Sequence, residues 1–318
     1  MGQNLGGIEM QNFMRFMAKR ILSAIIVLFG VSVVAFTLMR LAPGNPAALM
    51  LADNATAEQI AAVEAKMGLD KPLVQQYLIY ITGVLQGNLG TSIFFNRSCS
   101  ELIFGRLPAT GLLTFSAVLV SILVSFPMGI VSGIRKGSAV DFGSMVFALL
   151  GMSMSQVWLG LLFILFFGVF MGVLPTQGYG SFKNLILPAL TLGLPLAALV
   201  TRMLRSGMYE VLQEDYITAT KARGISNWKV YTKYALKNAL LPTITIIGMQ
   251  IGQLLAGAII VEQVFGWPGL GSLTVKAINM RDFPLIQSIL LVSAALFVVI
   301  NILVDIIYVI VDPRMSLD

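Results

Sequence analysis

Six long stretches of this 318-residue chain contain no Asp, Glu, Lys or Arg, and their spacing constrains the fold more than any other feature. A helix needs roughly 20 mostly apolar residues to cross a bilayer. Only 11% of the residues are charged, fewer than a soluble protein of this length needs on its surface. The sequence therefore predicts an all-α polytopic membrane protein with six transmembrane helices. The expected spans are 21–39, 110–134, 142–173, 185–204, 239–261 and 286–310.

The third and fourth stretches need separate treatment. The third contains 41 uncharged residues, which is enough for two short spans. Because Pro175 and Gly178 end its apolar part, we expect one long helix there. Pro188 and Pro195 interrupt the fourth stretch, but membrane helices tolerate proline and are often kinked by it.

The distribution of Lys and Arg predicts the orientation. If both termini are cytoplasmic, 13 of the 21 basic residues and the whole formal net charge of +6 lie on the cytoplasmic side. The first apolar stretch is longer than that of an ordinary signal peptide, so we expect it to be retained. The expected organisation is a cytoplasmic segment (1–20), a first transmembrane helix (21–40), an extracytoplasmic helical loop region (41–108), a five-helix core (109–311) with a cytoplasmic loop (205–238), and a cytoplasmic tail (312–318).

The composition disfavours several classes of chemistry. The chain has no histidine and a single cysteine, Cys99, so it lacks the usual nucleophile–base pairs and imidazole metal ligands. It also lacks a Gly-x4-Gly-Lys-Ser/Thr phosphate-binding loop. We therefore expect no enzymatic activity and no bound metal or cofactor in this chain. An intramembrane enzyme is disfavoured, whereas a stand-alone channel or secondary transporter stays open as an alternative.

The outer loop region carries helix signals of its own. Thr56 and Gln59 form a capping-box pattern, and Gly68 stands where that helix would end. Pro72 suits the first turn of a second helix. This region either packs on the outer ends of the spans or meets something that arrives from outside, and the pattern favours neither.

The cytoplasmic loop predicts two helices joined at a glycine. The segment 208–223 is polar and free of Gly and Pro, which favours a helix, and Gly224 suits the left-handed position after its end. Ser226 is a good N-cap for the next helix, and Ile225 can pack against Val230 in the following turn. Basic residues recur every four positions on this second helix, facing either anionic lipid or a cytoplasmic protein: Lys229, Lys233 and Lys237.

Residues 214–224 resemble the cytoplasmic "EAA" loop of binding-protein-dependent ABC importer permeases. Thr218, Ala219 and Thr220 stand at the Glu-Ala-Ala positions of the family pattern, and Gly224 stands at its glycine. The departures from Glu-Ala-Ala are typical of the dipeptide, oligopeptide and nickel permeases. Seven further segments resemble this family in order along about 300 residues: 41–46, 68–73, 87–92, 106–110, 187–195, 265–271 and 312–314.

The resemblance implies the type I ABC importer permease fold in a prokaryotic plasma (inner) membrane. It implies a second homologous permease subunit, two cytoplasmic ATPase subunits that bind ATP and Mg, and an extracytoplasmic substrate-binding protein; contact with the lipid bilayer is expected, and none with nucleic acid. A di- or oligopeptide is the preferred substrate, and a nickel chelate, glutathione or another small solute is the alternative. The helix that couples to the ATPase would comprise Glu214, Asp215, Tyr216, Thr218, Ala219, Thr220, Lys221, Ala222, Arg223 and Gly224.

Three further side chains stand out by their position. Asp305 is an acid inside the sixth span, and we expect it to pair with a neighbouring basic residue near the cytoplasmic end. Glu262 ends the fifth span and is followed by Trp267. These two residues either line an outer vestibule or mark the membrane interface.

Overall fold

The computed structural model describes residues 3–41, 56, 58 and 71–311. Every regular element in this part of the chain is helical. The first half contains α1 (Gln3–Leu41), α4 (Leu73–Leu85), α5 (Cys99–Phe104), α6 (Leu107–Ile134), α7 (Ala139–Ser153), α8 (Gln156–Phe163) and η1 (Ile164–Phe170). The second half contains α9 (Phe182–Val211), α10 (Asp215–Ala222), α11 (Asn227–Lys229), η2 (Val230–Ala235), α12 (Leu236–Leu255), α13 (Ile259–Val264), α14 (Leu270–Asn279) and α15 (Phe283–Val311).

Within the described residues, five helices are long and apolar enough to cross a membrane, and a bent pair of helices supplies a sixth span. The prediction of six spans is confirmed when the bent pair is counted as one. The five continuous spans are Met17–Thr37, Cys99–Ile134, Phe182–Val211, Asn227–Leu255 and Phe283–Ile307.

The expectation of one long third helix is wrong. Its two halves, Ala139–Ser153 and Gln156–Phe170, meet at an angle of 104°. Met154 and Ser155 have extended backbones with ψ near 132° and 136°, so the helix stops before Ser155 becomes the N-cap of α8. The Ser153 hydroxyl donates to the Leu149 carbonyl at 2.7 Å, as serine commonly does near a helix bend. Neither half of the bent pair contains a proline, so the bend is not a proline kink.

The most extensive helix packing joins α6 and α9. Small buried residues recur every four positions along α6, at Ala117, Ser121, Ser125 and Gly129. This is the small-residue spacing that lets membrane helices approach closely. A Cβ placed on Gly193 of α9 would lie only 2.7 Å from the carbonyl oxygen of Ala117. We call this contact between the two helices the α6–α9 seam. At Gly193 the two backbones are too close to leave room for a larger side chain.

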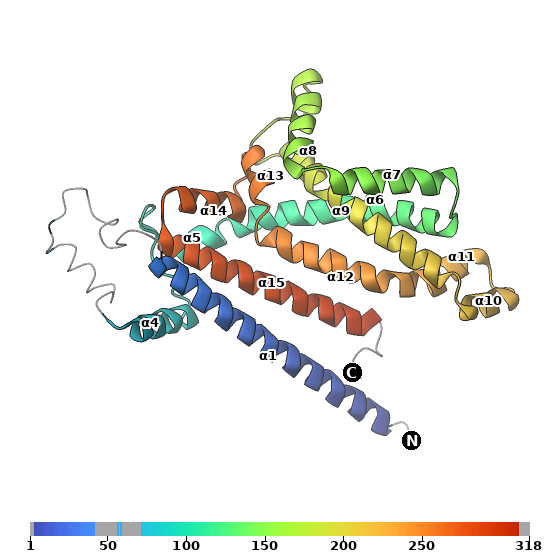
Figure 1. The fold of residues 1–318 in the computed structure, drawn as a ribbon, viewed down its shortest axis with the longest axis horizontal. Helices are drawn as coiled ribbons and strands as arrows, with labels where there is room; N and C mark the ends of the chain where they lie inside the picture. The colour runs from blue at the N-terminus through green and yellow to red at the C-terminus, as the bar shows by residue number, and fades with distance from the viewer. Residues whose placement is uncertain (1–2, 42–55, 57, 59–70, 312–318) are drawn as a thin grey trace.

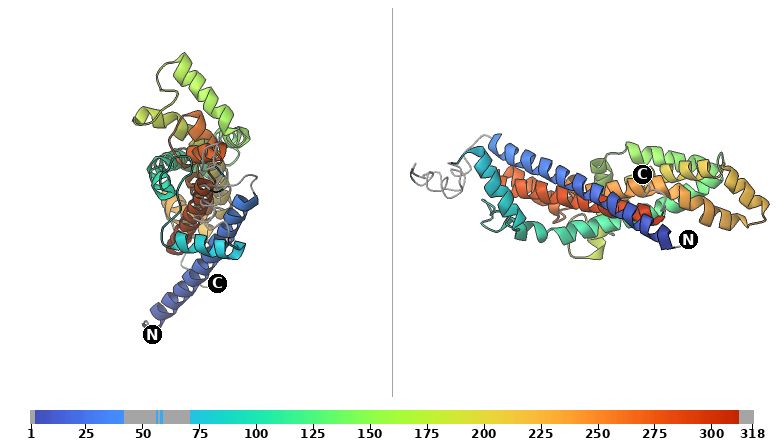
Figure 2. Two further views of the ribbon diagram at one scale, coloured as in Figure 1. Left: turned by 90° about the vertical axis from the view of Figure 1, so that its left-hand side faces the viewer. Right: turned by 90° about the horizontal axis from the view of Figure 1, so that it is seen from below.

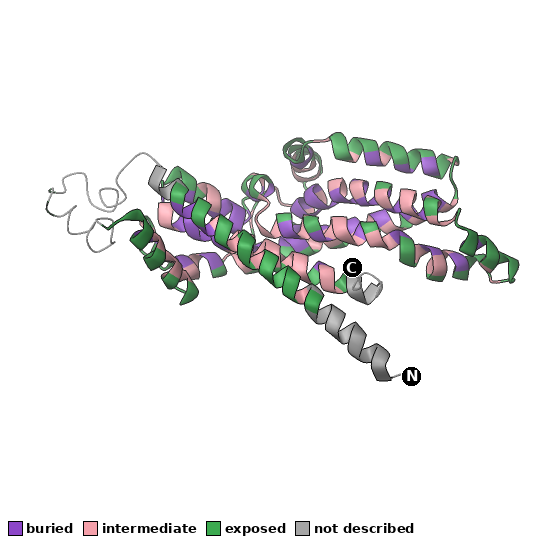
Figure 3. Cartoon of the chain, turned by 60° about the horizontal axis from the view of Figure 1, so that its bottom comes forward, coloured by how far each residue is buried: buried purple, intermediate pink, exposed green. Residues whose placement is uncertain are grey.

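The first helix packs along α15 at the edge of the bundle (Figure 1). Figure 3 shows that α1 is exposed along much of its length, and its exposed side chains include Ile21, Leu22 and Phe29. Arg20 forms an ion pair with Asp305 at 2.9 Å, which confirms the expected partner for the intramembrane acid. Pairing removes most of the cost of placing this charge at membrane depth.

The two ends of the molecule carry different elements. The start of α1 and the end of α15 lie toward the end that carries α10 and α11, whereas α4, α5 and α14 lie at the opposite end (Figures 1 and 2). An even number of spans requires this arrangement, because the chain must begin and finish on one side.

Candidate functional site

The loop between α9 and α12 holds a short helix, α10, at the far end of the molecule (Figure 1). The expected helix over 208–223 is divided, because α9 continues to Val211 and a turn separates it from α10. Met208 is fully buried, and a Cβ on Gly133 of α6 would lie 2.6 Å from its side chain. In the structure α9 therefore continues seven residues, about two turns, beyond the span expected at 185–204, and the α6–α9 seam runs along this extension.

Gly224 has the left-handed backbone expected of it, with φ of 76°. Its N–H donates to the Lys221 carbonyl at 2.9 Å and closes the end of α10. Ser226 is the N-cap of α11, as predicted. Ile225 packs against the buried cluster that contains Val230. The helix–glycine–helix arrangement is therefore present as the sequence indicates.

Two contacts fix α10 to the transmembrane helices. Ile217 is fully buried in a cluster that includes Leu204 of α9 and Ala239 of α12. The Tyr216 hydroxyl accepts a hydrogen bond of 2.7 Å from the Asn238 amide, also on α12. A displacement of α10 must therefore be transmitted to both α9 and α12.

The remaining surface of α10 is open. Within this part of the described chain, the side chains of the predicted coupling residues are exposed except for Thr220, which is half-buried and donates to the Tyr216 carbonyl at 2.6 Å. Trp228 in α11 is also 75% exposed, and it was not among the residues predicted from the sequence. An aromatic residue just after a helix N-cap in a polar loop was the available signal. The exposed residues at the predicted coupling positions are Glu214, Asp215, Tyr216, Thr218, Ala219, Lys221, Ala222, Arg223 and Gly224.

Glu262 and Trp267 do not line an outer vestibule, because both side chains are buried. The Glu262 carboxylate accepts hydrogen bonds from the Thr110 hydroxyl at 3.1 Å and from the Ser272 N–H at 2.7 Å. The Trp267 indole N–H donates to the Ala109 carbonyl at 2.9 Å. Burial raises the pKa of the Glu262 carboxyl above its ordinary value. These residues join α13 and α14 to the start of α6.

The helical outer region packs on the spans where it is described. Pro72 precedes α4, as predicted, and the Tyr77 hydroxyl lies 2.7 Å from the Ser32 hydroxyl of α1. The rings of Phe29 and Phe36 pack against Tyr77. The predicted helix over 56–68 lies almost entirely outside the described residues.

A buried aspartate that was not predicted from the sequence holds the segment before α5, which is the second part of the outer loop region. Asp282, between α14 and α15, is 1% exposed and accepts hydrogen bonds from the Ser92 hydroxyl. It also accepts from the backbone N–H groups of Ile93 and Phe94, each at 3.2 Å. One carboxylate thus ties the chain before α5 to a segment 190 residues further on.

Replacing Asp282 by Ala should destabilise the protein by about 2–4 kcal/mol, because buried donors lose a charged acceptor. The matched control is Glu101→Gln, which breaks an ion pair with Arg97 in which both side chains are 57% exposed. An exposed pair of this kind contributes at most about 1 kcal/mol. The thermal unfolding temperature of the purified importer should fall clearly for Asp282→Ala and not for Glu101→Gln. Equal effects of the two changes would contradict the stabilising role of the buried Asp282 carboxylate.

Comparisons with known proteins cover nearly the whole chain. Residues 125–317 match the model of the binding-protein-dependent transport system inner membrane component, and residues 13–131 match the N-terminal model of such components. The chain is 40% identical over 300 residues to the glutathione transport system permease protein GsiC of Salmonella choleraesuis (strain SC-B67), covering 94% of this chain and 98% of that protein. It is also 40% identical over 326 residues to the dipeptide transport system permease protein DppB of Alkalihalophilus pseudofirmus, with the same shares covered.

Among solved structures, the chain resembles the MetNI methionine ABC transporter in an inward-facing conformation. The TM-score is 0.53 at 18% identity, and the match covers 66% of this chain and 96% of that chain. This likeness concerns the fold alone. Membership in the matched family implies ATPase and substrate-binding partners. The chain belongs to the family of binding-protein-dependent transport system inner membrane components and is a transmembrane permease subunit of a type I ABC importer in the bacterial inner membrane.

Proposed function

We propose that this permease forms half of a translocation pathway for short peptides. Its relatives at 40% identity are named for dipeptide and glutathione transport, and glutathione is itself a tripeptide. Di- and oligopeptides are the main proposal, and glutathione is the specific alternative that the GsiC match favours. In either case an extracytoplasmic binding protein would deliver the substrate.

The observation that carries the mechanism is the anchored, exposed helix α10. We place it in the cytoplasm with both chain termini, since the net positive charge of the loops falls on that side under this orientation. Two partner ATPase subunits would bind ATP and Mg, and one of them would receive α10 on its surface. Closure of the ATPases would then move α9 and α12 through Ile217 and Tyr216. This chain contributes a mechanical link, without a catalytic group of its own.

The complete assembly would contain this chain, a second permease subunit, two ATPases and one binding protein. The test is uptake of radiolabelled tri-alanine and of glutathione by proteoliposomes that hold the purified complex with ATP inside. We expect ATP-dependent uptake of at least one of the two peptides when the binding protein is added outside. Uptake of neither peptide by a complex that hydrolyses ATP would refute the proposed substrate class.

A further inference from the structure

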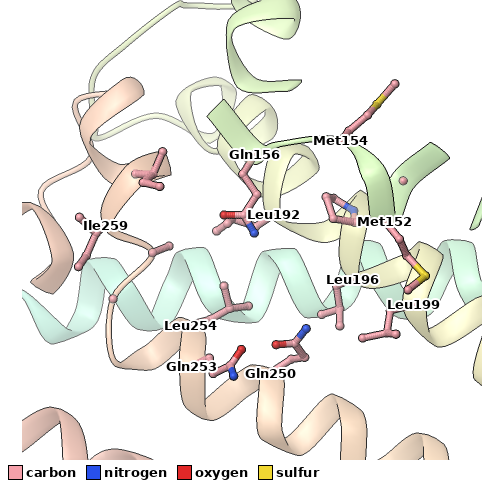
Figure 4. A pocket seen from close by; sticks show the side chains of 15 residues that line it. Met152, Met154, Gln156, Leu192, Leu196, Leu199, Gln250, Gln253, Leu254 and Ile259 are labelled. Atoms are coloured by element: carbon pink, nitrogen blue, oxygen red, sulfur yellow. The ribbon is translucent and has the colours of Figure 1, made fainter. Parts of the chain in front are cut away.

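A cavity of about 550 Å³ lies beside the bend in the third span (Figure 4). Its walls come from the bend itself (151–156), from α9 (192–199) and from the end of α12 with the start of α13 (250–260). This volume falls within the range of small-molecule binding sites. The elements that line the cavity lie between the end of the molecule that carries α14 and the end that carries α10 (Figure 1).

Three glutamine side chains supply most of the polar groups in this cavity. Figure 4 shows Gln156 on one side and Gln250 and Gln253 on the opposite side, with their amides extending into the space between. Gln250 and Gln253 share a face of α12 because they are three residues apart. Gln156 is the first residue of α8, so the 104° bend places it opposite α12. The lining contains no charged residue.

These amides lack partners within the described part of the chain, where no hydrogen bond joins any of the three to another residue. Each amide carries two N–H donors and one carbonyl acceptor. Exposure of such groups to hydrocarbon is costly, and Gln250 and Gln253 belong to a membrane span. The face that carries them must therefore meet water or a molecule that forms hydrogen bonds.

We propose that this cavity binds the peptide backbone of a substrate in transit, an inference that rests on the proposed function. A side-chain amide can donate to a peptide carbonyl and accept from a peptide N–H, so it matches any peptide irrespective of its side chains. Met152 and Met154 supply flexible apolar contacts for side chains of different shape. The uncharged lining neither attracts nor repels a particular side-chain charge, which suits a pathway that carries varied peptides.

Thiol labelling tests whether the cavity is open and occupied by peptide. The only cysteine, Cys99, is fully buried, so the unmodified chain provides an unreactive background. Gln156→Cys, Gln250→Cys and Gln253→Cys should react with a charged, membrane-impermeant maleimide in the assembled importer. The control is Met249→Cys, at a neighbouring residue on α12 that is 47% exposed but outside the lining.

We expect labelling of the cavity positions to be at least about tenfold faster than that of Met249→Cys, and to slow when millimolar tri-alanine and the binding protein are present. Labelling of all three cavity positions as slowly as that of Met249→Cys would show that this face is closed to water, and the proposal would be wrong. Fast labelling without slowing by tri-alanine would show a water-filled space that does not bind peptide, which also overturns it. Wild-type uptake reports separately on the substrate class, so failure of the proposed function is distinguishable.

A charge-selectivity measurement tests the same site in transport. Gln250→Glu with Gln253→Glu should shift the ratio of Ala-Lys-Ala to Ala-Glu-Ala uptake about tenfold toward the basic peptide. Met249→Glu, outside the lining, should leave that ratio unchanged. An unaltered ratio in the double variant, in a complex that still imports tri-alanine, would overturn the proposal, because a merely structural role would not respond to the charge of the substrate. If the double variant no longer imports tri-alanine, the single variants Gln250→Leu and Gln253→Leu are measured instead. Their KM for tri-alanine should rise, and an unchanged KM would overturn the proposal.

Discussion

Gly224→Val should abolish most ATP-driven uptake while the importer still assembles. Gly224 has φ of 76°, and a β-branched residue in this region costs about 1–2 kcal/mol. That strain lowers the equilibrium constant for forming the native turn by a factor of roughly 5–30. Because this turn fixes the end of α10, the proposed coupling helix, we expect ATP hydrolysis to continue without transport. Uptake and ATPase activity measured on the same proteoliposomes would show this uncoupling.

The control for this prediction is Gly224→Asn, since asparagine tolerates the left-handed region far better than valine. No neighbouring atom lies within 4 Å of a Cβ at this position, so the two variants differ in backbone strain and not in crowding. Asn should therefore retain substantial uptake. Normal uptake by Gly224→Val, in a complex that contains all subunits, would contradict the assignment of α10 as the coupling element.

Gly193→Val should prevent the permease from folding and assembling. A Cβ at Gly193 would lie 2.7 Å from the Ala117 carbonyl oxygen and 2.8 Å from the Val120 Cβ. A backbone oxygen within a helix cannot move aside as the end of a long side chain can. Overpacking of this kind costs about 3 kcal/mol or more. The yield of assembled complex after size-exclusion chromatography in detergent should fall sharply.

Gly111→Val on α6 is the matched control, because a Cβ there meets nothing within 4 Å. Both positions lie inside membrane helices, so both changes have similar effects on helix propensity. Equal yields of assembled complex from the two variants would show that α6 and α9 do not pack as closely at Gly193 as the structure indicates.

The spans and the coupling loop were predictable because their causes are local. Charge is excluded from lipid, so uncharged stretches mark the crossings, and a glycine after a polar helix marks a left-handed turn. The ion pair of Asp305 was also expected, since a charge inside a span needs a partner. These features depend on one residue type and its immediate surroundings.

Most of the features that could not be predicted from the sequence depend on distant contacts. The bend at Met154 and Ser155 is different: it lies inside a long uncharged stretch, and hydropathy does not show whether such a stretch forms one straight helix or two bent ones. Glu262 looked like an exposed residue at a membrane interface, but its partner Thr110 is 152 residues away. Met208 belongs to α9 and packs so closely on α6 that a Cβ on Gly133 would lie 2.6 Å from its side chain. None of these partners can be identified from local spacing.

The tightness of the α6–α9 seam determines which parts of the subunit move together. Sliding one helix past another needs compliant side chains between them, and along this seam backbone lies against backbone. The two helices should therefore turn as one stiff body during a transport cycle. Changes of angle must then be taken up at the non-helical joints, namely the turn before α10, Gly224 and the bend beside the glutamine cavity. A single rotation of the α6–α9 body would thus move both the cavity and α10, the proposed coupling helix, at the same time.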